Sequence, residues 1–460
     1  MRLKFLKYYA LTSNNNFNLF VNFNLLFSYD CFNIRRIEDN LFLMVKMKNR
    51  KYSDNFRSKV QKAALEIRKI FEPTPLQKNI YLSKRYKANI YLKREDLSPV
   101  RSYKLRGAFN AMSKLRNVAH FVCASAGNHA QGVAFMAAHF NVKATIFMPT
   151  TTPHQKVSKT QIFGGNNIEI KMTGDYFDDC LLAAKSFSSE RGAYFLSPFD
   201  DKDVIEGQGT VAAEIEEQLG FIPDKIVMPV GGGGLSAGII SYFENKSEYK
   251  FVEPAGAASL KAALETGKPK KLYSIDNFAD GASVAEVGKL NFNILKNTDI
   301  KNVLTIPENR ICTTMLEMLD LEGIVLEPAG ALSIDILKDI HNEIIDRNVV
   351  CITTGGNFDF ERLPEVKERA ARFSGIKKYF ILRLPQRPGA LKDFLETLGP
   401  NEDITRFEYL KKSARNFGSV LIGIETSKPE EFEALFSRLD AGDYGYKDIT
   451  NDDILSQFLI

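Results

Sequence analysis

The sequence predicts an α/β fold with mostly parallel sheets, followed by a small α+β domain at the C-terminus. Three observations lead to this prediction. Short apolar runs alternate with segments of helical spacing from residue 89 to residue 353, as in strands buried on both faces. Several of these runs lead directly into glycine or small polar residues. After about Ser374 the composition shifts and the order of the elements changes.

The main part of the chain begins with an expected helix from Asp54 to Ile70, where apolar residues recur at helical spacing before Pro73. Apolar runs then predict strands at residues 89–93, 121–124, 144–148, 168–170, 193–196, 226–230 and 349–353. Further helices are expected at residues 131–140 and 177–186. This alternation favours parallel sheets, because parallel neighbours need long crossover connections.

The C-terminal part is predicted to form its own small domain. Its expected strands are residues 379–384, 404–409 and 419–424, and its expected helices are residues 390–398 and 429–439. A βαββα unit of this length can enclose a core of its own. The chain is therefore divided into an extension over residues 1–48, a main domain over 49–374 and a small domain over 375–460.

Composition and charge exclude several classes of protein. The net charge of +5 is small for 460 residues and forms no basic stripe, so no nucleic-acid partner is expected. No apolar run is long enough to span a bilayer, so no membrane partner is expected either. The five cysteines form no CxxC pair, which argues against a disulfide framework or a zinc site and suits a reducing, cytoplasmic location.

The first 48 residues differ from the rest in being rich in Asn and Phe, with no acidic residue before Asp30. A run of asparagines at residues 14–16 interrupts the one candidate signal-peptide core. An organellar presequence is an alternative, although the segment is poor in arginine. We expect a disordered extension, or translation from an upstream start with Met44 or Met47 as the natural one.

Lys104 is the most informative candidate for chemistry. It stands in Ser102-Tyr103-Lys104-Leu105-Arg106-Gly107-Ala108. A lysine held between a hydroxyl, an aromatic ring and a glycine can form a Schiff base with an aldehyde cofactor. The alternative is a solvated lysine at the start of a helix, so the rest of the chain has to supply a phosphate cradle and a partner for a ring nitrogen.

A glycine loop follows the apolar run at 226–230. Its residues are Gly231, Gly232, Gly233, Gly234 and Leu235. Glycines let backbone N–H groups turn toward an anion, and a helix N-terminus adds partial positive charge, so the loop predicts a phosphate site. The pattern is neither GxGxxG with an acid nor GxxxxGK[ST], which disfavours a dinucleotide or a nucleoside triphosphate. A flexible loop is the alternative.

Two further strand ends carry candidate ligand-binding groups. One is Ser125, Ala126, Gly127, Asn128 and His129, whose N–H groups could hold a substrate carboxylate, although an ordinary capped helix start is the alternative. Asn128 could donate a hydrogen bond to a phenolate oxygen, whereas His129 alone suggests a structural role. The other is Thr354, whose hydroxyl could face a ring nitrogen before Gly355.

Glu253 and Glu327 each begin the pentapeptide Glu-Pro-Ala-Gly-Ala. The repeat is either chance or a sign of two strand ends that face one cleft. A cation site at Glu253 and Ala257 is a weak alternative, because Ser259 stands where an acid would help to complete the oxygen ligands. No metal is therefore expected.

Taken together, these motifs resemble the fold-type II pyridoxal-phosphate enzymes, and within them the biosynthetic threonine dehydratases (threonine ammonia-lyases), over about residues 54–460. Further family-like stretches are residues 148–149, 152–156, 206–210, 280–282, 385–391 and 403–409. The resemblance implies a tryptophan synthase β-like catalytic domain with two lobes, the smaller within about residues 95–200. It also implies an ACT-like regulatory domain over residues 375–460.

By this resemblance the cofactor is pyridoxal 5′-phosphate, which Lys104 carries and the glycine loop holds by its phosphate. Asn128 contacts the 3′ oxygen. Tyr103 stands beside the ring, where the family usually has Phe, and Thr354 faces the ring nitrogen, where it usually has Ser or Cys. The resemblance implies a lyase that dehydrates and deaminates L-threonine to 2-oxobutanoate. It also implies a homotetramer with isoleucine as its feedback inhibitor.

Several rival functions stay open at this point. A serine dehydratase, a serine racemase or a threonine synthase would share the fold. Ala126 stands where related racemases carry a serine, so little racemase activity is expected. From another class, a non-enzymatic amino-acid sensor would keep the fold and the tail, but an intact Lys104 and glycine loop argue against it.

Overall fold

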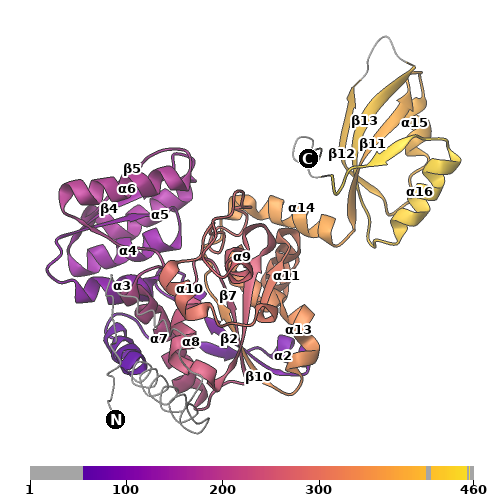
Figure 1. Ribbon diagram of the computed structural model, residues 1–460. Coiled ribbons are helices and arrows are strands. Elements are labelled where there is room, and N and C mark those ends of the chain that lie inside the picture. Colours follow the sequence, from indigo (N-terminus) through magenta and orange to yellow (C-terminus); the bar gives the residue numbers. More distant parts are fainter. Residues whose placement is uncertain (1–54, 411–415, 453–454, 456–460) are drawn as a thin grey trace, which may run out of the picture. The chain divides into compact units, whose positions relative to one another are not determined.

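The computed structural model describes residues 55–410, 416–452 and 455 (Figure 1). The extension expected over residues 1–48 lies outside this part of the chain. The first described helix spans residues 55–67, close to the range predicted from its spacing. Val60, Ala64 and Ile67 are each at most 3% exposed, so the apolar stripe faces the core as its period requires.

A six-stranded sheet forms the centre of the larger lobe, with the order β1-β2-β10-β7-β8-β9. All neighbours pair in parallel except β1 with β2. Its strands are β1 (Leu76–Lys78), β2 (Asn89–Arg94), β7 (Lys225–Pro229), β8 (Glu248–Pro254), β9 (Val303–Ile306) and β10 (Asn348–Thr353). Every residue of β7 is buried; the apolar run from Ile226 predicts this for four of them, and Lys225 pairs with Glu343 at 3.0 Å.

A second sheet of four parallel strands belongs to the smaller lobe and has the order β5-β4-β3-β6. Its strands are β3 (His120–Ala124), β4 (Lys143–Met148), β5 (Ile168–Met172) and β6 (Tyr194–Phe195). All four coincide with predicted apolar runs. The two parallel sheets confirm the predicted fold class.

β8 and β9 were not predicted from the sequence. Lys250 interrupts the apolar run of β8, and it is buried because its ammonium pairs with Glu343 at 2.8 Å. β9 has four residues and gives little pattern to recognise. The ion pair shows how a charged residue enters a buried strand without leaving an uncompensated charge.

Most helices of the two parallel sheets lie in the connections between their strands, as parallel neighbours require. In chain order they are α2 (Ile80–Tyr86), α3 (Lys104–Lys114), α4 (Asn128–Phe140), α5 (His154–Gly164), α6 (Phe177–Arg191), α7 (Lys202–Leu219), α8 (Gly234–Phe243), α9 (Ser259–Thr266), α10 (Lys289–Leu295), α11 (Glu308–Glu322), α12 (Pro328–Asp335), α13 (Leu337–Ile344) and α14 (Leu363–Phe373).

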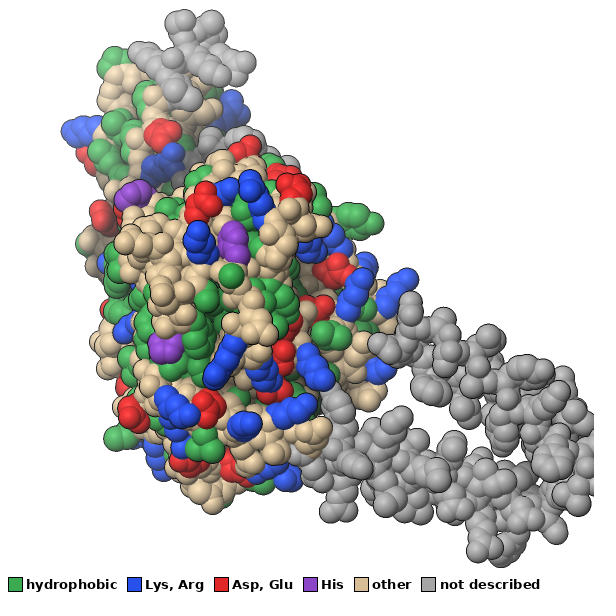
Figure 2. All heavy atoms as spheres, turned by 90° about the vertical axis from the view of Figure 1, so that its left-hand side faces the viewer, with side chains coloured by type: hydrophobic (Ala, Val, Ile, Leu, Met, Phe, Trp, Pro, Cys, Tyr) green, Lys and Arg blue, Asp and Glu red, His purple; other side chains and the backbone are tan. Residues whose placement is uncertain are grey.

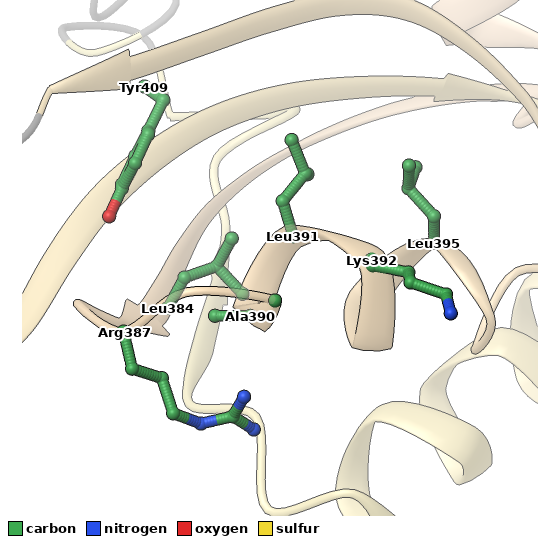
Figure 3. A pocket seen from close by; sticks show the side chains of 8 residues that line it. Leu384, Arg387, Ala390, Leu391, Lys392, Leu395 and Tyr409 are labelled. Atoms are coloured by element: carbon green, nitrogen blue, oxygen red, sulfur yellow. The ribbon is translucent and has the colours of Figure 1, made fainter.

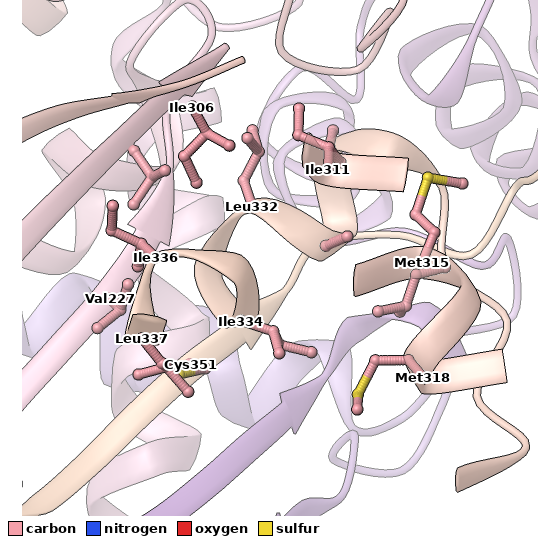
Figure 4. Close-up of a cluster of buried hydrophobic side chains, with 14 of the residues drawn as sticks. Val227, Ile306, Ile311, Met315, Met318, Leu332, Ile334, Ile336, Leu337 and Cys351 are labelled. Atoms are coloured by element: carbon pink, nitrogen blue, oxygen red, sulfur yellow. The ribbon is translucent and has the colours of Figure 1, made fainter. Parts of the chain in front are cut away.

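Apolar side chains fill the space between the large sheet and its helices. Figure 4 shows one such cluster, where Val227 and Cys351 of the sheet meet Leu332 and Leu337 of the covering helices. Each of these four side chains is fully buried. This packing holds the strand ends in fixed positions, and the candidate site is built on those ends.

The C-terminal residues form a four-stranded antiparallel sheet with the order β12-β13-β11-β14. Its elements are β11 (Lys377–Pro385), α15 (Ala390–Leu395), β12 (Asp403–Leu410), β13 (Phe417–Glu425), α16 (Glu431–Ala441) and β14 (Tyr446–Asp448). The predicted βαββα order is confirmed. β14 is an additional strand that pairs with β11.

Among the described residues, no helix has both the length and the apolar character needed to cross a bilayer. On the face drawn in Figure 2, lysine and arginine side chains are interspersed with aspartate and glutamate side chains. The basic residues on that face therefore do not gather into a stripe of one sign.

Candidate active site

Lys104 begins helix α3, and backbone pairing ties the preceding residues to the end of β10. Ser102 forms an antiparallel bridge with Gly355, and the Tyr103 N–H donates to the Thr354 carbonyl at 3.2 Å. The bridge therefore places Lys104 next to the strand end that carries Thr354. Two candidates far apart in the sequence are thus brought together.

A buried ionic network anchors the first turn of α3. The Arg106 guanidinium is fully buried between Glu95, at 2.8 Å, and Glu214, at 2.6 Å. Lys93 donates to the same Glu214 at 2.6 Å, and these charges hold the pKa of Glu214 down at about 2 although burial opposes this. Buried pairs of this kind add little net stability, but removing one partner is costly. This structural role of Arg106 was not predicted from the sequence.

The amine of Lys104 lies among aromatic rings and a carbonyl. Its Nζ donates to the Pro198 carbonyl at 2.9 Å and lies 5.4 Å from the centre of the Tyr103 ring and 5.9 Å from that of Phe199. Burial lowers the pKa of Lys104 to about 8, and Glu327 partly opposes this effect. Roughly a tenth of such amines are neutral at pH 7, against fewer than one in a thousand for an ordinary lysine.

The glycine loop connects β7 to α8, and Phe199 packs against it. Gly233 has a φ of +87°, which favours glycine. A Cβ at Gly232 would lie 2.2 Å from the Phe199 ring, so a side chain there would displace the ring that also faces Lys104. α8 starts at Gly234 without a side-chain cap, which leaves the first N–H groups of the helix for an anion.

Thr354 follows the last residue of β10 and is 3% exposed. Its Oγ1 is buried and has no hydrogen-bond partner among the described residues. A buried hydroxyl without a partner is costly unless a ligand supplies one. A pyridine nitrogen is a suitable acceptor. The orphaned hydroxyl, the uncapped glycine loop and the buried amine of low pKa therefore fit pyridoxal phosphate.

The segment Ser125–His129 lies where β3 leads into α4. The Asn128 Nδ2 donates to Glu327 at 2.7 Å, and the Asn128 Oδ1 accepts from Asn357 at 2.6 Å. A Cβ at Gly127 would meet no atom within 4 Å, so open space lies in front of this strand end. The segment thus combines free space with the N-terminal N–H groups of a long helix, as a substrate carboxylate requires.

His129 is buried, and its Nε2 lies 3.1 Å from the Leu196 carbonyl. Burial, together with the nearby charge of Lys104, lowers the pKa of His129 to about 3. The imidazole is therefore neutral at physiological pH, and the side chain ties α4 to the segment after β6. Only the backbone N–H of His129, and not its side chain, is therefore a candidate for binding a substrate.

The two identical pentapeptides do not face one cleft. The Glu253 carboxylate ends β8 and accepts from the N–H groups of Leu260 and Lys261 at 2.7 and 3.0 Å, so it caps α9. Glu327 instead precedes α12 and reaches Asn128. Among the described residues, no group of three or more His, Cys, Asp and Glu side chains could hold a metal ion.

Three further residues, Glu327, Asn357 and Phe199, shape the site, although no site role was predicted for them from the sequence. Glu327 was singled out through its repeated pentapeptide but was given no role, and Asn357 closes the Thr-Thr-Gly-Gly-Asn stretch. Phe199 gives no signal in the sequence, because its place between Lys104 and Gly232 depends on how the two lobes pack. Motif reasoning could have found the first two.

A separate pocket of about 420 Å³ lies in the C-terminal domain (Figure 3). It is lined by Leu384, Arg387, Gly389, Ala390, Leu391, Lys392, Leu395 and Tyr409. Leu391 and Leu395 project from the same side of α15. Apolar side chains with a flanking arginine and lysine suit a small ligand that has both an aliphatic part and a carboxylate.

Comparison with known proteins places the chain in a family. The model of pyridoxal-phosphate dependent enzymes matches residues 67–355, and that of the C-terminal regulatory domain of threonine dehydratase matches residues 368–459. The biosynthetic L-threonine dehydratase IlvA of Lactococcus lactis subsp. lactis (strain IL1403) is 46% identical over 404 residues, which cover 86% of this chain and 97% of the relative.

Two solved structures are also similar. The processed form of threonine deaminase isoform 2 from Solanum lycopersicum has a TM-score of 0.65 and 36% identity, covering 70% of this chain and 88% of that one. The threonine deaminase of T.th. has a TM-score of 0.61 and 30% identity, covering 66% of this chain and 98% of that shorter one. The chain therefore belongs to the biosynthetic threonine dehydratases, a family of pyridoxal-phosphate-dependent enzymes with a C-terminal regulatory domain.

Proposed function

We propose that this chain is an L-threonine dehydratase that converts L-threonine to 2-oxobutanoate and ammonia, the first step of isoleucine biosynthesis. The observation that carries the proposal is the meeting of three groups. Phe199 contacts both the Lys104 amine and the glycine loop, and backbone pairing sets Thr354 beside Lys104. An amine, a phosphate cradle and a hydroxyl for a ring nitrogen are the groups that a pyridoxal-phosphate lyase needs.

Lys104 would hold the cofactor and then act as the general base. Bound pyridoxal phosphate withdraws electrons from the substrate, so that the Cα proton becomes acidic and the β-hydroxyl can leave. The Nζ of Lys104, once freed by the substrate amine, takes the Cα proton. A pKa of about 8 suits this task, because the amine is neutral often enough to accept a proton and basic enough to hold it.

Two residues favour elimination over competing reactions. Thr354 offers a neutral hydroxyl, which would donate a hydrogen bond to the ring nitrogen of bound pyridoxal phosphate without protonating it, and an unprotonated ring nitrogen favours prompt elimination over transamination. Ala126 carries no group that could return a proton to the opposite face of Cα. We therefore expect little racemase activity, and L-to-D interconversion at a rate near that of elimination would contradict this expectation.

The C-terminal domain would bind isoleucine as a feedback inhibitor. The leucines of the pocket in Figure 3 suit its branched side chain, and Arg387 and Lys392 suit its carboxylate. The pocket includes part of the family-like stretch at residues 385–391. Inhibition at a distance requires two states of the enzyme that differ in their affinity for isoleucine.

A single steady-state assay tests the proposal. Release of 2-oxobutanoate from threonine, with a lower rate when isoleucine is present, is the expected result. Deletion of the residues after Gly375 should keep the activity and remove the response to isoleucine. Preference for serine, with no turnover of threonine, would favour a serine dehydratase instead. A full-length enzyme that ignores isoleucine would refute the regulatory part.

The assembly and the location are also proposals. We infer a cytoplasmic homotetramer, which light scattering of the purified enzyme would test. The four described cysteines are buried and unpaired, as suits a reducing compartment. Burial raises the pKa of Cys123 and of Cys312 to about 12, so both thiols are protonated and unreactive.

A further inference from the structure

Glu327 is a buried acid that the mechanism above does not use. It is 4% exposed and directly precedes α12. Its backbone N–H donates to the Gly355 carbonyl at 3.2 Å, which fixes it beside the strand end that carries Thr354. Its Oε1 accepts from the Asn128 Nδ2 at 2.7 Å. A buried carboxylate that has a side chain of the site as its hydrogen-bond partner calls for an explanation.

The Asn128 amide has one polar hydrogen left for a ligand. An amide group offers two N–H donors and a carbonyl acceptor. The carbonyl accepts from Asn357, and one N–H donates to Glu327. These two contacts do not use the second N–H, which can therefore donate a hydrogen bond to an oxygen atom of a bound ligand. The two neighbours therefore decide which way the amide of Asn128 points.

The hydrogen bonds around Asn128 form a chain in which each residue donates to the next, from Lys159 through Asn357 and Asn128 to Glu327. Lys159 donates to the Asn357 Oδ1 at 2.6 Å, so the Asn357 Nδ2 is left to donate to Asn128 and to the Val100 carbonyl. Asn128 then donates onward to Glu327. An ionised carboxylate accepts hydrogen bonds and cannot donate them. Glu327 is thus the final acceptor of this hydrogen-bond chain. As a carboxylate it favours only the orientation in which the Asn128 amide directs an N–H toward it.

We propose that Glu327 is a positioning residue that acts through Asn128, holding the free N–H of its amide toward the 3′ oxygen of the cofactor. The inference rests on the proposed role of Asn128 at the cofactor. Without the carboxylate, the amide can turn over and present its carbonyl to that oxygen, where two acceptors repel each other. The expected consequence is weaker cofactor binding and a changed environment of the cofactor's ring.

The surroundings of Glu327 bring the pKa of its carboxyl group close to physiological pH. Burial, followed by the negative charge of Asp280, raises the pKa of Glu327 to about 7, while Asn128 and Lys156 act in the opposite direction. Lys104, Lys159 and Tyr103 also lie within electrostatic reach of the carboxyl group. A pKa raised by burial means that the carboxyl is ionised above about pH 7 and protonated below it. Protonation would release the constraint on Asn128.

A double-mutant cycle tests the inference without relying on turnover. The variants are E327Q, N128A and the double variant, and the measurements are the dissociation constant of pyridoxal phosphate from the full-length enzyme and the position of the cofactor's absorption band. E327Q should weaken binding severalfold, because a glutamine can present either its oxygen or its NH2 group to Asn128 and so no longer fixes the orientation of that amide. If Glu327 acts through Asn128, E327Q should add nothing in the N128A background. Independent, multiplying effects would overturn the inference.

Glu253 provides a matched control. It begins the same pentapeptide and is fully buried, and its pKa is also raised to about 7 by burial, but its carboxylate caps α9. E253Q should therefore leave cofactor affinity and the absorption band unchanged. If both variants shift the band equally, the effect of E327Q is a general loss of packing and the proposal fails.

A second variant keeps the test usable if E327Q does not fold. N357D places an acceptor where the Asn128 carbonyl needs a donor, and it should weaken cofactor binding in the same way and be silent in the N128A background. A wild-type enzyme that binds pyridoxal phosphate but does not release 2-oxobutanoate from threonine would refute the proposed function. That result would leave the positioning role of Glu327 to be decided by the binding data.

Discussion

The catalytic region and the C-terminal domain differ in the type of sheet on which their candidate sites are built, parallel in the first and antiparallel in the second. In the catalytic region, the C-terminal ends of β7 and β10 in one parallel sheet lead to the glycine loop and Thr354, and the end of β3 in the other parallel sheet leads to Asn128. In the C-terminal domain, the turn after β11 and helix α15 form most of a pocket that is lined largely by apolar side chains. Parallel strand ends collect polar groups from distant segments, whereas a helix beside an antiparallel sheet offers a mostly apolar binding surface.

The two regions also differ in how they hold charge. Around α3, Arg106 and Glu95 are both fully buried, and their hydrogen bonds fix the turn that begins at Lys104. In the pocket, Arg387 pairs with Asp393 at 2.6 Å while both side chains remain about half exposed. Chemistry needs groups that do not move, and their burial costs stability. Reversible binding of an effector can use exposed pairs that a ligand can replace.

The largest expected effect is on activity alone: one substitution in the catalytic region should abolish turnover and leave isoleucine binding in the C-terminal domain unchanged. K104A should lower the rate of 2-oxobutanoate release by roughly a thousandfold or more, because the proposed cofactor anchor and the proposed base would be lost together. Isoleucine should still bind, which calorimetry of the variant would measure. K114A is the matched control, since Lys114 lies on the same helix and pairs with Asp203 and Glu206 at its surface. Equal losses in both variants would break the comparison.

The second effect is a pH dependence of cofactor loading. A lysine with a pKa of about 8 is mostly protonated below that pH, and only the neutral amine can attach the cofactor. The rate at which pyridoxal phosphate binds covalently to the cofactor-free enzyme should rise about tenfold per pH unit from pH 6 and level off above pH 8. A stopped-flow record of absorbance measures it. A rate that keeps rising to about pH 10 would mean that burial does not lower this pKa.

The third effect concerns the pocket alone. R387A should raise the isoleucine concentration for half-inhibition about tenfold, as expected when a charged hydrogen bond to a carboxylate is lost. The rate without isoleucine should stay the same, because Arg387 lies in the other region. K428A serves as the control, since Lys428 is exposed in the same domain and outside the pocket. An unchanged isoleucine response in R387A would place the effector elsewhere.

The smallest effect tests the orphaned hydroxyl. T354V should weaken pyridoxal phosphate a few-fold, because the ring nitrogen loses its donor. The cofactor-free variant should be as stable as the wild type or more stable, by up to about 1 kcal/mol, because Thr354 Oγ1 has no hydrogen-bond partner to lose within the part of the chain that the structure describes. Thermal unfolding with and without the cofactor measures both. A cofactor-free variant that is clearly less stable would show that the hydroxyl already has a partner.

The sequence predicted much of the fold because its strands are strong local patterns. β3, β4, β7 and β10 each contain a mostly apolar run, so burial on both faces can be inferred from the residues themselves. β8 was missed because Lys250 is buried through its pair with Glu343, a partner that lies far along the chain. β14 was missed because three residues carry too little pattern.

The chemical identity of the site was present in the sequence by itself: a lysine beside an aromatic residue, four consecutive glycines after an apolar strand, and a threonine at a strand end. Each depends on residue type and on neighbours along the chain. The tertiary structure decided what those groups meet. Identical pentapeptides place Glu253 on the N-terminus of α9 and Glu327 on Asn128, because the role of a carboxylate is set by the donors that folding brings within 3 Å of it.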